Sequence, residues 1–259
     1  MTDAPGAGAC GSRDRTEARQ PVIVVTGASG GLGRATALRC GLTGWRVAVH
    51  YHTHRETAEA IVTEIARDGG QAMAYQADVT HVPSVAALVA RVTERWGRID
   101  AWVNNAGVID DGLLVTMPEA AWDRLIATNL SSAWSAIRAV APVMTTQREG
   151  IILNVASLVA LQGRRGQSNY AAAKAGLIAL TRSAASELAP YGVRVNAICP
   201  PVLETELAAS SAAALRAQQL LPGATDPARA AEALVAVLSL PWISGHTFVL
   251  DSRIAEGAL

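Results

Sequence analysis

Short apolar runs alternate with longer stretches of helical period along this chain, beginning near residue 21. The first run, residues 22–26, is continuous, which is typical of a parallel strand that is buried on both faces. Further runs recur between the helical stretches. We predict about seven strands, at residues 22–26, 46–50, 73–76, 101–104, 151–156, 193–198 and 248–250.

The helical stretches carry apolar residues at three- and four-residue spacing. The first follows a glycine-rich turn and is expected to stop near Cys40, before Gly41 and Gly44. A longer one has Thr116 as its predicted cap and a break near Asn129. The other predicted helices are residues 56–68, 82–96 and 169–189.

Repeated β-α-β units predict an α/β fold, namely a single Rossmann-type, doubly wound parallel sheet with helices on both faces. The chain has 259 residues, the usual size of one such domain. We expect a disordered leader over residues 1–20 and one domain over 21–259, with a substrate lid at about 204–222.

Charge and cysteine content exclude several classes of function. Lys and Arg number 22 and Asp and Glu number 22, and this neutrality argues against a nucleic-acid or membrane partner. The first 20 residues lack the apolar segment of a signal peptide, and no run of 18 apolar residues occurs. Cys10, Cys40 and Cys199 show no metal-ligand spacing. We therefore expect a cytoplasmic protein without a metal site.

The glycine-rich turn, Thr26–Gly33, is the first candidate for chemistry. It lies between the first strand and its helix, where a doubly wound fold binds phosphate on free backbone N–H groups. Gly27 permits a tight turn, Gly31 allows a pyrophosphate to approach, and Gly33 allows helix and strand to pack closely. The expected cofactor-binding residues here are Gly27, Ser29, Gly31, Leu32 and Gly33.

The end of the second strand bears on the choice of dinucleotide. An NAD-binding protein usually has an acid there, whereas this chain reads His50-Tyr51-His52-Thr53-His54-Arg55 before its first acid, Glu56. Basic side chains favour a 2′-phosphate, so we expect NADP(H) to be preferred over NAD(H). A solvated loop is the alternative, because histidines carry little charge near neutrality. The candidate contacts are Tyr51, His52, Thr53 and Arg55, with Arg34 as a further phosphate partner.

Tyr170 and Lys174 open the last long predicted helix. Positions four apart lie on one helix face, so the phenol and the ammonium are expected to point into one pocket. An ammonium nearby should lower the phenol pKa from its usual value of about 10. Such a tyrosine can donate a proton to a forming alkoxide or remove one in the reverse direction.

Taken in order, these motifs resemble the short-chain dehydrogenase/reductase family from about residue 21 to 251. The resemblance implies that Ser157 hydrogen-bonds the substrate carbonyl and that Tyr170 is the general acid. It implies that Lys174 binds the nicotinamide ribose and lowers the Tyr170 pKa, and that Asn129 holds a water of the proton relay. A local helix kink at Asn129 is equally compatible with the sequence. The matching motifs are Thr26–Gly33, Asp78-Val79, Asn104-Asn105-Ala106-Gly107, Asn129, Ser157, Tyr170 with Lys174, and Pro200 with Thr205.

The resemblance also assigns cofactor contacts elsewhere. Asp78 and Val79 would place the adenine, Asn104 would stabilise the sheet, and the segment from Pro200 to Thr205 would hold the nicotinamide carboxamide. Asn105, Ala106 and Gly107 complete the expected set. This chain departs from the family at two positions. Pro201 stands where a glycine is usual, and Gly30 stands where many NADP-dependent relatives have a basic residue.

Within the family, residues 163–177 most resemble 3-oxoacyl-[acyl-carrier-protein] reductases. That resemblance implies an acidic acyl carrier protein as partner, docking on Arg148. The second docking position holds Tyr191 rather than arginine, and Arg164 and Arg165 are candidates for the missing charge. The predicted lid is rich in alanine and has no aromatic residues, which suits a flexible acyl chain in fatty-acid-like or polyketide metabolism.

Three functions therefore compete. The first is NADPH-dependent reduction of a β-ketoacyl thioester, and the second is reduction or oxidation of a free sugar, polyol or small alcohol. The third is a non-catalytic dinucleotide-binding regulator, which the intact set of candidate catalytic residues disfavours. Apolar residues on several faces of the helices around Asn129 and Tyr170 predict burial between subunits. The family resemblance implies dimers or tetramers built on these helices, and we expect a homotetramer.

Overall fold

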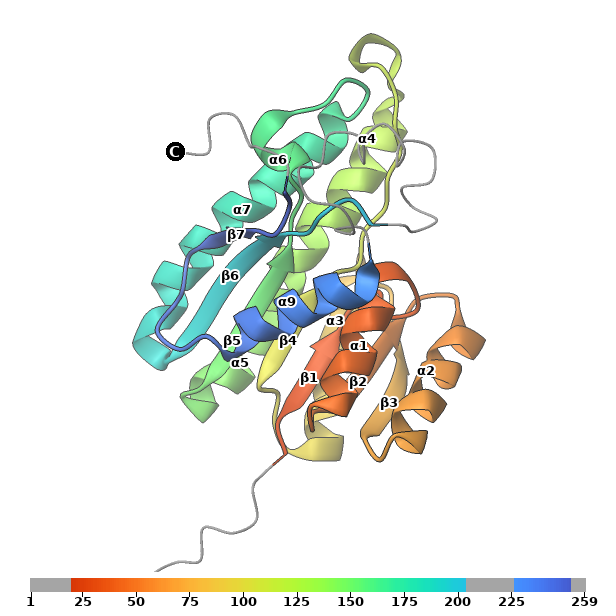
Figure 1. Cartoon of the computed structure of the whole chain (residues 1–259). Helices are drawn as coiled ribbons and strands as arrows, with labels where there is room; N and C mark the ends of the chain where they lie inside the picture. Colours follow the sequence, from red (N-terminus) through yellow and green to blue (C-terminus); the bar gives the residue numbers. More distant parts are fainter. Residues whose placement is uncertain (1–19, 204–225, 253–259) are drawn as a thin grey trace, which may run out of the picture.

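The sheet determines where every other element lies. The computed structural model describes residues 20–203 and 226–252. Within them, seven strands form one sheet in the order β3-β2-β1-β4-β5-β6-β7, and every neighbouring pair is parallel (Figure 1). The predicted doubly wound sheet is confirmed. The strands are β1 Val22–Val25, β2 Arg46–Tyr51, β3 Gln71–Gln76, β4 Ala101–Asn104, β5 Gly150–Val155, β6 Val193–Cys199 and β7 Thr247–Val249.

Helices cover both faces of this sheet. One face carries α1 (Gly31–Leu42), α2 (Arg55–Arg67) and α9 (Pro227–Ser239), of which α1 and α9 lie side by side in Figure 1. The other face carries α3 (Val82–Trp96), α5 (Ser132–Gln147) and α7 (Ser168–Leu188). The sequence did not predict α9. The shorter helices are η1 Leu114–Thr116, α4 Glu119–Ile126, η2 Ala127–Ser131, α6 Val159–Gln162 and η3 Ala189–Tyr191.

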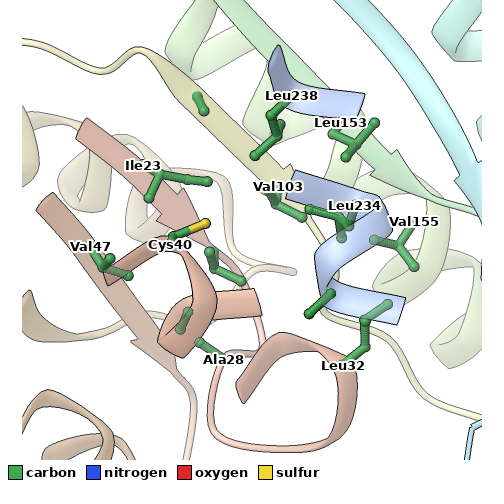
Figure 2. Packing of buried hydrophobic residues seen from close by; sticks show 14 of the residues in the cluster. Ile23, Ala28, Leu32, Cys40, Val47, Val103, Leu153, Val155, Leu234 and Leu238 are labelled. Atoms are coloured by element: carbon green, nitrogen blue, oxygen red, sulfur yellow. The ribbon is translucent and has the colours of Figure 1, made fainter. Parts of the chain in front are cut away.

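The larger hydrophobic core lies beneath α1 and α9. Leu234 and Leu238 of α9 pack toward Val103, Leu153 and Val155 of the central strands, beside residues of α1 (Figure 2). These side chains are at most 7% exposed. Burial on both faces of the central strands explains why their sequences are continuous apolar runs rather than alternating ones.

Two predicted helix boundaries are wrong. The first helix does not stop near Cys40 but continues through Gly41 to Leu42. Gly41 serves helix packing, because a Cβ there would lie 2.7 Å from Cγ2 of Ile65 on α2. Thr116 belongs to η1, and the helix it was expected to cap begins at Glu119.

The predicted break near Asn129 is confirmed. Residues Ala127–Ser131 form a π-helical segment between α4 and α5. Single π-turns inside helices are often found at functional sites.

Some predictions fall outside the described residues: the leader except Gln20, the lid at about 204–222, Thr205 and Cys10. Across the ranges that the structure describes, no helix combines the length and the apolar character needed to cross a membrane.

Candidate active site

The glycine turn is shaped by close backbone packing. Gly27 has φ of +61°, in the left-handed region that favours glycine, and a Cβ there would lie 2.9 Å from Cα of Ala106. A Cβ on Gly33 would lie 2.5 Å from Nδ2 of Asn105. The first N–H groups of α1 have no intrahelical acceptor and face the helix N-terminus, so this cradle fits the pyrophosphate of a dinucleotide.

Thr26 and Asn105 lock this turn to the end of β4. The Thr26 hydroxyl accepts hydrogen bonds from the backbone N–H groups of Asn105 (2.9 Å) and Ala106 (3.0 Å), and donates one to the Val103 carbonyl (3.1 Å). The Asn105 amide donates to the carbonyl oxygens of Thr26 and Gly27, at 2.9 and 3.1 Å. Asn105 is therefore held by the turn that it supports.

His50 does not belong to the basic patch predicted at the end of β2. Its side chain is 1% exposed, and burial lowers its pKa to about 4, so it is neutral at pH 7 and offers no charge to a phosphate. Tyr51 is also buried, in the core beneath α1 and α2. His52 and Thr53 are exposed.

The arginines predicted for this patch are already paired. Arg55 donates to Glu59 at 2.7 Å, and Arg34 donates to Glu64 at 2.6 Å. Arg34 and His54 nevertheless line a large cleft, described below, that begins beside the glycine turn, so a phosphate there would meet basic side chains.

Asp78 and Val79 follow β3 at the same edge of the sheet. The Asp78 carboxylate accepts hydrogen bonds from the backbone N–H and the hydroxyl of Thr80 (2.8 and 2.7 Å), and these bonds lower its pKa. The Asp78 backbone N–H donates to the Ser84 hydroxyl at 2.9 Å. The carboxylate is therefore ionised at neutral pH and held by its own loop.

Three candidate catalytic residues meet at the carboxyl end of β5. Ser157 follows β5, and its side chain hydrogen-bonds Tyr170, in the first turn of α7. One helical turn later, the Lys174 ammonium donates to the Val155 carbonyl at 2.7 Å. Lys174 Nζ lies 5.6 Å from the centre of the Tyr170 ring. The structure thus brings together Ser157, Tyr170 and Lys174 as the sequence predicted.

The balance of charge effects at Tyr170 differs from the prediction. Burial raises the pKa of Tyr170 to about 12, against the lowering effect of the Ser157 hydrogen bond. Burial also lowers the pKa of Lys174 to about 8. The pKa of Tyr170 is therefore raised overall rather than lowered as predicted, because desolvation is the largest effect. The phenol keeps its proton at neutral pH.

Asn129 lies in the π-helical segment and is 2% exposed. Its amide donates to the Val108 carbonyl (2.7 Å) and accepts from the Val108 N–H (2.8 Å), which holds the segment after β4. Asn129 and Lys174 also line an enclosed cavity of about 10 Å³, together with Asn104 and Val79. This volume is about that needed for one water molecule.

A cleft of about 1280 Å³ connects these parts. It runs from the glycine turn past Asn105–Gly107 to Ser157 and Tyr170, and Pro200 and Pro201 line it as well. Cys199 precedes these prolines. Burial raises the pKa of its thiol to about 11, against the lowering effect of a hydrogen bond between the thiol and the Ser157 backbone.

Sequence reasoning missed Gln167, which lines the same cleft one turn before Tyr170. Its amide donates to the Asp111 carboxylate at 2.8 Å, while its buried carbonyl oxygen has no hydrogen-bond partner among the described residues. It also missed Asn169, whose side chain accepts from the Tyr170 N–H (2.7 Å) and donates to the Asp110 carbonyl (2.9 Å). The available signal was their position just before the tyrosine, Asn169 next to it and Gln167 in the preceding turn.

The predicted docking arginines differ in their position relative to the cleft. Arg148 caps the end of α5, and its exposed guanidinium stacks 5.4 Å from the centre of the Tyr191 ring and donates to the Pro190 carbonyl. Arg164 lines the cleft and Arg165 is exposed. Arg148 and Tyr191 thus form one surface feature, separate from the cleft lining.

Known proteins match this chain along most of its length. A family model described as short chain dehydrogenase matches residues 21–216. The chain is 43% identical over 197 residues to "3-oxoacyl-[acyl-carrier-protein] reductase FabG" of Staphylococcus aureus, covering 76% of this chain and 80% of that protein.

A "3-oxoacyl-[acyl-carrier-protein] reductase" of Synechocystis sp. is 42% identical over 186 residues, covering 72% of this chain and 75% of that protein. Among solved structures, one titled "Crystal Structure of Levodione Reductase" matches with a TM-score of 0.83 and 30% identity. The match covers 90% of this chain and 96% of that one.

Proposed function

The chain belongs to the short-chain dehydrogenase/reductase family of NAD(P)-dependent oxidoreductases, and we propose that it reduces β-ketoacyl thioesters carried by an acyl carrier protein, with NADPH as reductant. The observation that carries the proposal is the convergence of Ser157, Tyr170 and Lys174 in the cleft that begins at the glycine turn. The names of the relatives supply the substrate class.

The glycine cradle and the cleft fit a dinucleotide. The N–H groups of the first turn of α1 would hold the pyrophosphate, and Lys174 would bind the ribose next to the nicotinamide. When bound, the dinucleotide supplies the hydride that reduces the carbonyl carbon. The proposed preference for NADPH is supported by Arg34 and His54 on the cleft wall, close in sequence to the turn and to the end of β2.

The protein's own groups handle the substrate oxygen. The Ser157 hydroxyl donates a hydrogen bond to the carbonyl, which orients it and stabilises the charge that develops on its oxygen. Tyr170 then donates its phenol proton to that oxygen as it becomes an alkoxide. The raised pKa of Tyr170 keeps this proton in place until it is needed.

Lys174 and Asn129 would restore the proton. The Lys174 ammonium stabilises the tyrosinate left after the transfer. The water-sized cavity that Lys174 shares with Asn129 provides a place for a relay water. Because the amide oxygen and the amide nitrogen of Asn129 are both hydrogen-bonded to the Val108 backbone, its side chain would act by shaping that cavity.

The first experiment measures NADPH oxidation with acetoacetyl-acyl carrier protein beside a panel of free ketones, with NADH in parallel. Turnover that is at least about tenfold more efficient with the carrier-bound substrate supports the proposal. Turnover of free ketones alone would retain the catalytic residues and discard the carrier protein.

The proposed carrier surface has its own test. Reversing the exposed charge with Arg148→Glu should raise the KM for the carrier-bound thioester about tenfold and leave the KM for a free ketone unchanged, because only the acidic partner meets this surface. Arg67→Glu, an exposed charge reversal at the end of α2, is the matched control. Equal KM changes for both substrates would exclude Arg148 as a docking residue.

Reduction of a free ketone is the second candidate, favoured by the likeness to levodione reductase over almost the whole length of both chains. The same residues would act on such a substrate. The substrate panel above separates the two candidates, since a free ketone reductase needs no carrier.

We also propose a cytoplasmic homotetramer. Trp122 of α4 and Trp134 of α5 are 38% and 47% exposed, and aromatic side chains are enriched in protein–protein interfaces. Light scattering after size-exclusion chromatography should give four times the chain mass, and Trp134→Glu should reduce it. A monomer at micromolar concentration would refute the tetramer.

A further inference from the structure

His50 is a buried histidine that the proposed mechanism does not use. It is the penultimate residue of β2, between buried Val49 and Tyr51, and is 1% exposed. A buried imidazole must find partners for both ring nitrogens. The partners of His50 identify what it does.

Each ring nitrogen of His50 meets a backbone group of a different loop. The Gly27 N–H donates to Nδ1 at 3.0 Å, and Nε2 lies 3.1 Å from the Ala77 carbonyl oxygen. A carbonyl oxygen only accepts, so Nε2 carries the proton and donates it, whereas Nδ1 accepts. One neutral tautomer therefore satisfies both contacts.

The backbone of β2 adds to this connection. The His50 carbonyl accepts the Ala28 N–H at 2.9 Å, and the Tyr51 carbonyl accepts the Ala77 N–H at 3.1 Å. Two consecutive N–H groups of the glycine turn, those of Gly27 and Ala28, thus both donate to His50. The imidazole spans the end of β2 and ties the turn after β1 to the segment after β3.

These two segments are the ones to which the proposed function assigns the dinucleotide. The glycine turn would hold the pyrophosphate, and Asp78 and Val79, which directly follow Ala77, would hold the adenine. We propose that His50 is a positioning residue for the cofactor, whose imidazole clips the Gly27 turn to the Ala77 segment and sets their spacing. This inference rests on the proposed dinucleotide-dependent function.

The surroundings of His50 keep it in the required form. Burial lowers its pKa to about 4. This value includes the opposing effects of the hydrogen bond to Ala77 and the carboxylate of Asp78, and a smaller lowering by the nearby charge of His52. At neutral pH the imidazole therefore stays uncharged, and Nδ1 remains an acceptor.

Two variants separate the two contacts. His50→Leu fills the space but removes both hydrogen bonds. His50→Asn places its Oδ1 close to the position of Nδ1, so it keeps the acceptor for Gly27 and loses only the donor to Ala77. His246→Asn is the matched control, because its side chain is exposed beside β7, at the far end of the sheet from β2.

The readouts are the Kd for NADPH, measured by fluorescence titration of the protein without substrate, and the steady-state KM and kcat. His50→Leu should raise both the Kd and the KM for NADPH about tenfold and leave kcat within about twofold. His50→Asn should recover most of the lost affinity, and His246→Asn should match the wild type. A general loss of structure would lower kcat as well.

The inference is overturned if His50→Leu binds NADPH as the wild type does, if it lowers kcat without changing the KM, or if the leucine and asparagine variants lose affinity equally. Where the leucine variant does not fold, His50→Ala takes its place, because it also removes both contacts. An asparagine variant with wild-type NADPH affinity beside an alanine variant with weaker affinity then supports the inference. Equal affinities of the two variants reject it. If the wild type binds NADH instead, the same titrations use NADH. A wild type that binds neither dinucleotide overturns the proposed function and this inference together, whereas an active wild type with unchanged variants overturns this inference alone.

Discussion

The two ends of the cleft treat their polar groups differently. At the glycine turn, Thr26, His50 and Asn105 are satisfied by hydrogen bonds within the protein. At the catalytic end, burial raises the pKa of Tyr170 and lowers that of Lys174. The first end is held in one arrangement by hydrogen bonds between neutral groups, whereas the second holds two groups, Tyr170 and Lys174, that the proposed mechanism needs in ionised form although burial disfavours it.

The difference shows that cofactor binding and catalysis require different environments for polar groups. A cofactor cradle has to keep one shape, so its backbone groups are cross-linked by side chains. A proton donor has to change its protonation state, so its surroundings cannot provide the best hydrogen bonds for both the protonated and the deprotonated form. Sites of this second kind reduce the stability of the folded protein, which is the usual conflict between stability and activity.

The largest expected effect comes from removing the proton donor. Tyr170→Phe should lower kcat about 10³-fold and leave the Kd for NADPH within about twofold, because only the phenol oxygen is lost. Steady-state kinetics and fluorescence titration measure the two quantities. The variant also loses the hydrogen bond to Ser157, so Ser157→Ala is run beside it. If Tyr170→Phe keeps more than about a tenth of the activity, another group is the acid.

Lys174→Met should separate activity from stability. Turnover should fall about 10²-fold, and the Kd for NADPH should rise as well, since the ammonium is proposed to serve both. At pH 7 and without dinucleotide, the free energy of unfolding should rise, because a pKa lowered from 10.5 to about 8 corresponds to a penalty of about 3 kcal/mol on the buried ammonium.

The sign follows from proton binding. Between pH values of about 8 and 10.5 the unfolded chain binds more protons at Lys174 than the folded chain does, so this group's contribution to stability rises with pH. Below that window the full penalty remains. Loss of the hydrogen bond to the Val155 carbonyl offsets part of the gain. A Lys174→Met protein that is less stable than the wild type in urea unfolding would show that the ammonium is a structural anchor instead.

Much of the glycine-turn end could be predicted from the sequence. The strand, the turn and the helix after it are local patterns, and so is the spacing of Tyr170 and Lys174 on one helix face. The family resemblance implied that Ser157 acts together with Tyr170, and its position after β5 agrees, because the pocket of an open α/β sheet lies outside the carboxyl ends of its strands.

What could not be predicted depends on contacts between distant residues. The buried contacts of His50 were not predicted, because its partners, Gly27 and Ala77, lie 23 and 27 residues away. Its apolar neighbours in β2 were the available signal. The pairing of Arg34 with Glu64 spans 30 residues, whereas that of Arg55 with Glu59 has i,i+4 spacing and was visible. The desolvation of Tyr170 requires the packed structure.

His50 gives a smaller effect, in acid. Because its folded pKa is about 4 and its ordinary value 6.5, the unfolded chain binds more protons between these values, so stability from this group falls by up to about 3 kcal/mol as the pH drops through that window. His50→Asn removes this titration. Urea unfolding of both proteins at several pH values should give a smaller acid-side slope for the variant. Parallel curves would mean that His50 titrates normally in the folded protein.

The smallest effect comes from adding a further positive charge at the glycine-turn end. Gly30 has φ of −159°, which any residue adopts, and no atom of the described residues lies within 4 Å of where its Cβ would be. Gly30→Arg should therefore fold normally and lower the KM for NADPH about threefold to fivefold, because an added guanidinium can pair with the 2′-phosphate. The KM for NADH should not change, and high salt should cancel the gain. Gly30→Gln is the control of similar length without charge. An equal gain with glutamine, or with NADH, would mean that the side chain acts by packing, and the 2′-phosphate would then lie elsewhere than beside the glycine turn.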